Sequence, residues 1–234
     1  MKTSRIMISL LCGAMLAACS SSTAPVETPP TPTHLQSAVT NQYYPLTPGT
    51  LTVFHTQNAD GLEIDSLRVA SVTKVINGFD ATEVHDIVYL NGSVIEDTYD
   101  WFAQDSAGNV WYLGEDTKQY DSGVVVGTAG TWQWGVQGAT PGVVMWGDPA
   151  ARVGKVYRQE FFKGHAEDLG KVITVGETVT VAYGTLTGCV KTEEWNTLEP
   201  LQLHDNKFYC PSVGTALEVA GGTHDRTELF SKTP

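Results

Sequence analysis

The sequence predicts an all-β fold built as a single antiparallel meander. Runs rich in Val, Ile, Thr and aromatic residues alternate with turn residues at short intervals. Two of the turns are Asn-Gly pairs, Asn77-Gly78 and Asn91-Gly92, which are the strongest short signal for a β-hairpin. No segment keeps an apolar period of 3.6 residues over three turns. About ten or more such strands indicate a barrel, a half-barrel or a sandwich, because these architectures protect sheet edges.

The first half of the domain has the most regular strand pattern. The alternation of residue types breaks near Ala70, as it does at a β-bulge. The turns expected after the two Asn-Gly pairs lie at 105–109 and at Ser122-Gly123. The expected strands are 50–53, 62–76, 81–90, 93–104 and 110–114.

The second half of the domain is also predicted to form strands, although its residue pattern is less regular. Short apolar and β-branched runs are separated by Gly, Pro and Asn. The expected strands are 157–162, 178–183, 189–195, 207–210, 217–219 and 227–230.

The N-terminus has the features of a secretory signal peptide. Lys2 and Arg5 precede an apolar run that ends at Leu16, and this run is too short to span about 30 Å of hydrocarbon. Leu16-Ala17-Ala18-Cys19 resembles the bacterial lipobox, in which the Cys becomes the lipidated first residue of the mature chain. We therefore expect residues 1–18 to be removed and Cys19 to hold the protein on a membrane. Ser20, rather than Asp, favours the outer membrane if the organism is Gram-negative.

The expected organisation is a signal peptide at 1–18, a lipidated tether at 19–42 and one β domain at 43–234. The tether is rich in Pro, Ser and Thr and has few large apolar residues, so we expect it to be disordered. The remaining length suits one domain. The whole chain has 14 basic and 26 acidic residues, and loss of the signal peptide leaves a formal net charge of −14. This charge argues against a nucleic-acid partner.

Two cysteines remain in the mature domain. Cys12 leaves with the signal peptide and Cys19 carries the lipid, so Cys189 and Cys210 are left to pair in an oxidising compartment. A loop of about 20 residues closed by a disulfide is worth roughly 3 kcal/mol in the chain-entropy model. Zinc binding by the pair is the alternative, although the spacing fits no familiar finger.

The densest group of acidic residues lies between 96 and 116. If the turn closes at Asp105 and Val110, Asp100 faces Glu115, and like charges directly opposite are destabilising unless something compensates them. Three interpretations remain open: carboxylates that face water, an acid–base pair, or a site for a divalent cation such as calcium. The candidate metal ligands are Asp97, Asp100, Glu115 and Asp116.

The same stretch resembles part of an uncharacterised family of bacterial secreted β-rich proteins and lipoproteins. Further parts of the pattern are Tyr157-Arg-Gln-Glu160, Gly164-His-Ala-Glu-Asp168 and Cys210-Pro-Ser-Val-Gly214. The resemblance covers about residues 43–230. It implies a shared fold and a shared ligand, and no activity. Because a bulkier residue often stands at the position of Cys210 in that family, the resemblance implies that the disulfide is a local feature.

Aromatic residues gather between 99 and 146. Trp132 and Trp134 are two residues apart, as on one face of a strand. They can pack in the core or form a platform or cavity for a sugar, lipid or pigment. The candidate ligand-binding residues are Trp101, Trp111, Trp132 and Trp134.

No catalytic residue is assigned. Four His–carboxylate neighbours have spacings too wide for a metal site, and there is no Gly-x-Ser-x-Gly motif or phosphate loop. The sequence favours a non-enzymatic lipoprotein of the cell envelope that binds a small ligand, a cation or another envelope component. The alternatives are an envelope hydrolase using an acidic pair and a structural or assembly accessory of the outer membrane. No cofactor is expected beyond the possible cation.

Overall fold

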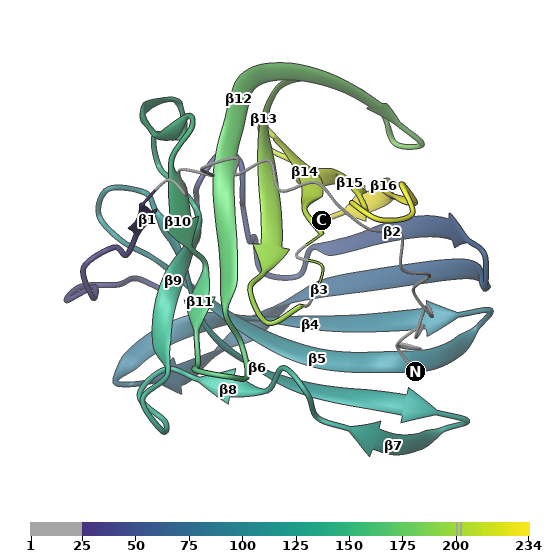
Figure 1. Cartoon of the computed structure of the whole chain (residues 1–234), viewed down its shortest axis with the longest axis horizontal. Coiled ribbons are helices and arrows are strands. Elements are labelled where there is room, and N and C mark those ends of the chain that lie inside the picture. The colour runs from purple at the N-terminus through teal and green to yellow at the C-terminus, as the bar shows by residue number, and fades with distance from the viewer. Residues whose placement is uncertain (1–24, 200, 202) are drawn as a thin grey trace, which may run out of the picture.

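The strands form one curled sheet. The computed structural model describes residues 25–199, 201 and 203–234, so the predicted signal peptide, Cys19 and the first part of the predicted tether lie outside the described residues. Sixteen strands join in one sheet that curls into a half-barrel (Figure 1), which confirms the predicted all-β class and selects one of its three architectures. Among the described residues the only helical element is a 3-10 turn at Ala150–Arg152. None of them forms a helix long and apolar enough to cross a membrane.

The first half is a regular meander in which each strand pairs with the next. Its turns at Asn77-Gly78 and Asn91-Gly92 have positive φ at all four residues, as hairpin turns of this type require. The predicted break near Ala70 is present as a register shift between Val69 and Thr73. The strands are β2 (Leu51–Asn58), β3 (Gly61–Ile76), β4 (Phe79–Leu90), β5 (Ser93–Gln104) and β6 (Val110–Asp121).

The second half forms another meander, and its last strand pairs with the first strand of the first half. β12 begins ten residues before the predicted strand at 178, because bulges between Val172 and Glu177 interrupt the alternation on which the prediction rested. The far end of the β12–β13 hairpin bends back over β15 and β16 (Figure 1), and Tyr183 there donates its backbone N–H to Leu229. The strands are β12 (Asp168–Val181), β13 (Gly184–Asn196), β14 (Asp205–Cys210), β15 (Gly214–Val219) and β16 (Arg226–Thr233).

The two ends of the sheet meet at one short segment. β10 (Val156–Arg158) pairs with β12, and two residues later β11 (Glu160–Phe161) pairs with β9 (Thr140–Met145), which continues the sheet from β6. This crossover brings Glu160 to the inside of the curl, opposite β5 and β6. Two further short strands, β7 (Val124–Gly127) and β8 (Trp132–Gln133), pair with β6 only.

The N-terminal segment from residue 25 packs on the sheet, which differs from the tether expected up to residue 42. β1 (Val26–Glu27) pairs with β10. The backbone N–H groups of Thr40 and Asn41 both donate to Oε1 of Gln104, and Val39 is 3% exposed. Composition suggested a disordered segment, but these long-range hydrogen bonds fix its second half.

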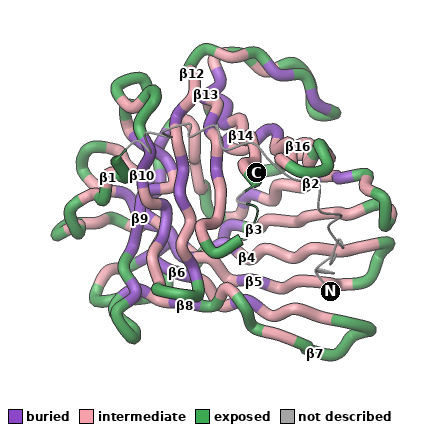
Figure 2. Tube along the Cα trace, in the orientation of Figure 1, coloured by how far each residue is buried: buried purple, intermediate pink, exposed green. Residues whose placement is uncertain are grey.

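Burial is greatest where the sheet curls most tightly, near β6, β9, β10 and the lower part of β12 (Figure 2). A separate apolar cluster lies around the predicted disulfide. Cys189 and Cys210 are bonded, with an S–S distance of 2.00 Å, so this prediction is confirmed. The bond joins β13 to β14 beside Phe54 and Leu229.

Candidate functional site

Asp100 and Glu115 lie opposite one another on β5 and β6, as predicted. The strand register beside the turn differs from the predicted one. Gln104 pairs with Val110 beside the turn, one residue away from the predicted register, and a bulge next to Gly114 restores it. Gly114 has a φ of 139°, and a Cβ there would lie 2.5 Å from a backbone oxygen of β8, so only glycine fits. The bulge therefore decides that the two carboxyl groups meet.

Burial opposes ionisation of both groups. The Tyr112 hydroxyl donates to Asp100 and the Thr117 hydroxyl donates to Glu115 at 2.8 Å. Burial, and then the negative charge of Asp86, raise the pKa of Asp100 to about 8 despite the Tyr112 hydrogen bond. Burial, and then Asp100, raise the pKa of Glu115 to about 8. At neutral pH both side chains are therefore mostly protonated.

A second carboxyl pair lies further along the same inner face. Asp65 of β3 and Asp86 of β4 influence one another's protonation, and burial is the largest cause for both. Burial raises the pKa of Asp65 to about 6 and that of Asp86 well above its ordinary value. A hydrogen bond between the two side chains affects both pKa values. Two such carboxyl groups are most stable when they share a proton.

A third carboxyl pair, Glu160 and Asp168, stands on the opposite wall. Glu160 is only 6% exposed, and its carboxyl group interacts with the side chains of Asp168 and Trp132. Burial and then the charge of Asp168 raise the pKa of Glu160 well above its ordinary value, and burial raises that of Asp168 to about 6. Like the second pair, these two buried carboxyl groups are most stable when they share a proton.

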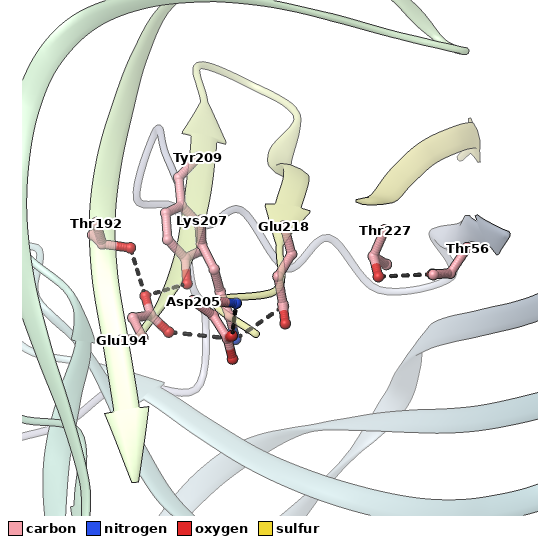
Figure 3. Close-up of polar contacts among 9 residues, drawn as sticks. Thr56, Thr192, Glu194, Asp205, Lys207, Tyr209, Glu218 and Thr227 are labelled. Carbon is pink, nitrogen blue, oxygen red and sulfur yellow. Dashed lines mark hydrogen bonds and ion pairs between the residues drawn. The ribbon is translucent and has the colours of Figure 1, made fainter. Parts of the chain in front are cut away.

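The wall that carries Glu160 and Asp168 also contains a cation, the ammonium group of Lys207. The Lys207 ammonium lies 3.4 Å from Oε2 of Glu194 and 3.3 Å from Oε2 of Glu218. Thr192 and Tyr209 donate hydroxyl hydrogen bonds to Oε1 of Glu194 at 2.7 and 2.8 Å (Figure 3). Burial lowers the pKa of Lys207, but Glu218 and Glu194 outweigh it, so the pKa is raised. The wall therefore stabilises an ammonium ion.

These groups surround a cavity of about 360 Å³ inside the curl of the sheet. This volume is within the ~300–1,000 Å³ range typical of small-molecule sites. Aromatic rings of Tyr44, Phe102, Tyr112 and Tyr209 line part of it, with Tyr44 and Phe102 centroids 5.4 Å apart. The acidic residues that line it are Asp86, Asp100, Glu115, Glu160, Asp168 and Glu194.

The four predicted metal ligands do not converge. Side chains alternate along a strand, so Asp100 and Glu115 face the cavity while Asp97 and Asp116 lie on the outer face. Asp97 contacts His85 Nε2 there at 2.8 Å. Within the described part of the chain, no group of three or more His, Cys, Asp or Glu residues has the arrangement of a metal site. A cation at the Asp100–Glu115 pair stays a prediction.

The four predicted tryptophans are core residues, each at most 6% exposed. β8 covers only Trp132 and Gln133, and a turn follows, so Trp132 packs edge-on against Tyr112 while Trp134 stacks on Phe79. None of the four lines the central cavity, and Trp111 lines a separate pocket beside residues 27–34. These contacts are the ones expected if the tryptophans pack in the core. A ligand role for them stays a prediction.

The sequence analysis missed Glu160, Asp168, Glu194 and Lys207 as site residues. Glu160 and Asp168 did stand in two of the motifs that carried the family resemblance, which was the available signal. Glu194 and Lys207 lie on strands distant in sequence from residues 96–116. Pairing of β13 with β14 and the curl of the sheet bring them to the cavity.

No family model and no curated protein matches the chain. Two solved structures resemble the chain over most of its length, with TM-scores below 0.5. A "putative exported protein with YmcC-like fold" from Bacteroides fragilis is 15% identical, with a TM-score of 0.47, and the match covers 82% of this chain and 98% of that one. A "putative lipoprotein" from Parabacteroides distasonis is 13% identical, with a TM-score of 0.39, and covers 82% and 99%. These identities are too low to transfer a function, so the function is inferred from the chain's own residues.

Proposed function

We propose that this chain is a lipid-anchored extracytoplasmic binding protein and that its central cavity takes up a small ligand. The observation that carries the proposal is the acidic lining of the cavity, in which only Glu194 of six carboxyl side chains forms an ion pair among the described residues. A ligand that supplies donors or positive charge would offset the cost of burying the other five.

At the Asp100–Glu115 pair, binding has more support than hydrolysis. An acid–base pair needs one protonated and one ionised carboxyl group, and their environments normally push the two pKa values apart. Here burial raises the pKa of Asp100 and that of Glu115 to about the same value, 8. At neutral pH the pair lacks an ionised base.

The envelope location rests on the sequence of residues 1–19. We expect Cys19→Ala to abolish lipidation and to shift the protein from the membrane fraction to the soluble fraction. The measurement is membrane fractionation together with incorporation of a labelled fatty acid. Normal processing and unchanged membrane association of the variant would contradict the lipid-anchor proposal, and release of both forms by detergent serves as the control.

Ligand binding can be tested on the mature lipoprotein extracted in mild detergent without chelator. We expect native mass spectrometry to show added mass that denaturation removes. The double variant Asp100→Asn/Glu115→Gln should lose this mass. Asp116→Asn should keep it, because Asp116 lies on the same strand but on the outer face. A bare wild-type chain, or a ligand retained by the double variant, would contradict a ligand site at this cavity.

A further inference from the structure

We propose that the ligand of the central cavity is an organic cation carrying two or more ammonium groups. This inference rests on the proposed function and goes beyond it by naming the ligand's chemistry. It depends on three features of the cavity: an excess of carboxyl groups on two facing walls, aromatic rings between them, and an ammonium ion of the protein that already occupies one position.

The first feature is the arrangement of acidic groups. Asp86, Asp100 and Glu115 come from β4, β5 and β6, and Glu160 and Asp168 come from β11 and β12 on the other wall. In the described part of the chain, no Lys, Arg or His forms an ion pair with any of these five. Glu160 is 6% exposed and lines the cavity beside Asp168, so this wall places two buried carboxyl groups together.

The second feature is the Lys207 ammonium. It lies in the same cavity between Glu194 and Glu218, with both N–O distances below 3.5 Å. Glu194 and Glu218 therefore stabilise an ammonium group. The charge of Lys207 also lowers the pKa of Asp168, but the remaining carboxyl groups form no ion pair within the described residues. Ammonium groups of a ligand would therefore complete the pattern.

The third feature is the aromatic lining. Phe102 and Tyr112 stack with centroids 5.0 Å apart, and Tyr44 lies 6.0 Å from Tyr209. Aromatic faces attract ammonium ions and also cover the carbon skeleton between them. An inorganic cation would not use these rings. Neither is there, among the described residues, a group of three His, Cys, Asp or Glu arranged to hold one.

Two carboxyl clusters on facing walls favour a ligand with two charged ends over one with a single charge. Linear polyamines and amino sugars both present such ammonium groups on a small skeleton. The shared chemistry is therefore the paired ammonium groups, and the choice between the two skeletons is one result of the test below.

Binding of this ligand should release protons. Burial holds Asp100 and Glu115 mostly protonated at neutral pH, and each must ionise to pair with an ammonium group. Affinity should therefore rise with pH until the amines themselves lose their protons. The titratable groups that face the pair are Tyr44, Asp65, Asp86, Glu96, Tyr112, Glu160, Asp168, Glu194 and Lys207.

The experiment is isothermal titration of the detergent-extracted mature lipoprotein, stripped of bound ligand by dialysis. The probes are putrescine, spermidine, a glucosamine disaccharide, butylamine and 1,4-butanediol. We expect putrescine, spermidine or the disaccharide to bind at least about tenfold more tightly than butylamine, and butanediol not to bind. The tightest of the three identifies the skeleton. Between about pH 6.5 and pH 8.5 its affinity should rise at least about tenfold, with proton release visible in buffers of different ionisation enthalpy.

Matched variants locate the site. Glu115→Gln and Glu160→Gln should each weaken binding of that probe at least about tenfold, because each removes one charge from a different wall. Asp116→Asn removes a charge from the outer face and should change the affinity less than about twofold. Thermal unfolding of each variant verifies that it folds.

Three results would overturn the inference. They are equal binding of putrescine and butanediol, an affinity unaffected by Glu115→Gln and Glu160→Gln, and no amine binding at either pH. If no amine binds but native mass spectrometry still shows a ligand that depends on Asp100 and Glu115, the inference fails and the proposed function stands. If neither amine nor any other ligand binds, both fail.

Discussion

The two walls of the cavity stabilise their buried carboxyl groups in different ways. On the wall formed by β13–β15, Glu194 and Glu218 share the Lys207 ammonium, and a disulfide joins β13 to β14. On the wall formed by β4–β6, Asp86, Asp100 and Glu115 approach one another with no cation, and protonation replaces the missing charge. The comparison teaches that the β13–β15 part of one wall supplies its own cation, while the β4–β6 wall has room for an additional positive charge.

The largest expected effect concerns the disulfide that stiffens the first wall. Cys189→Ala/Cys210→Ala should lower the free energy of unfolding by about 3 kcal/mol, because the bond closes a loop over a sequence separation of 21 residues. Urea unfolding measures the loss. Hydrogen exchange should increase more in β13 and β14 than in β5 and β6. An equal increase in both walls would remove the difference in stiffness on which this part of the comparison depends.

Removal of the compensating cation is expected to have the next largest effect. Lys207→Met should destabilise the protein by roughly 2–3 kcal/mol, because Glu194 and Glu218 are then left without the ammonium between them. The measurement is urea unfolding at about pH 7.5. A neutral effect would mean that the two walls do not differ in their need for a cation.

Loss of a charged group from the β4–β6 wall should stabilise the protein rather than destabilise it. Asp100→Asn keeps an oxygen that can accept the Tyr112 hydrogen bond and removes an unfavourable buried charge. It should stabilise the ligand-free protein by about 1–2 kcal/mol at pH 8, where the native carboxyl group begins to ionise. Thermal unfolding gives the difference, and Asp116→Asn on the outer face is the control. Strong destabilisation by Asp100→Asn would instead indicate that this carboxylate holds a cation.

The pH dependence follows with a defined sign. The pKa of Asp100 is raised from 3.8 to about 8 on folding, so the folded state binds the proton more tightly than the unfolded chain. This stability is fully present below about pH 4 and is lost as the pH rises towards about 8. The melting temperature of the ligand-free protein should therefore fall by roughly 3 °C per pH unit between about pH 5 and pH 8. Asp100→Asn/Glu115→Gln should flatten this slope, and an unchanged slope would contradict the assignment.

The smallest effect should come from an ion pair outside the cavity. Lys171 and Glu193 lie 3.7 Å apart and are each about one third exposed. Lys171→Met should change the free energy of unfolding by less than about 0.5 kcal/mol, because water and salt screen such pairs. A cost comparable to that of Lys207→Met would show that burial is not what separates the two kinds of pair.

The sequence by itself determined the strands of the meander, the two Asn-Gly hairpins, the bulge near Ala70 and the disulfide. These features depend on local turn chemistry, on residue alternation or on counting cysteines, all of which can be read along the chain. The pairing of Asp100 with Glu115 also followed from a hairpin, although a bulge at Gly114 had to correct the register. The lipid anchor and the signal peptide stay predictions, because residues 1–24 are outside the described part of the chain.

Only the tertiary structure decided what the inner face encloses. Alternation places every second residue of a strand on one side, but it does not say which side becomes the inside of a curl. The curl turned Asp100 and Glu115 inwards and Asp97 and Asp116 outwards, and it placed all four candidate tryptophans in the core. The crossover from β10 to β11 then brought Glu160 against strands about 50 residues earlier. Contacts at such separations depend on how the sheet closes, which no local pattern encodes.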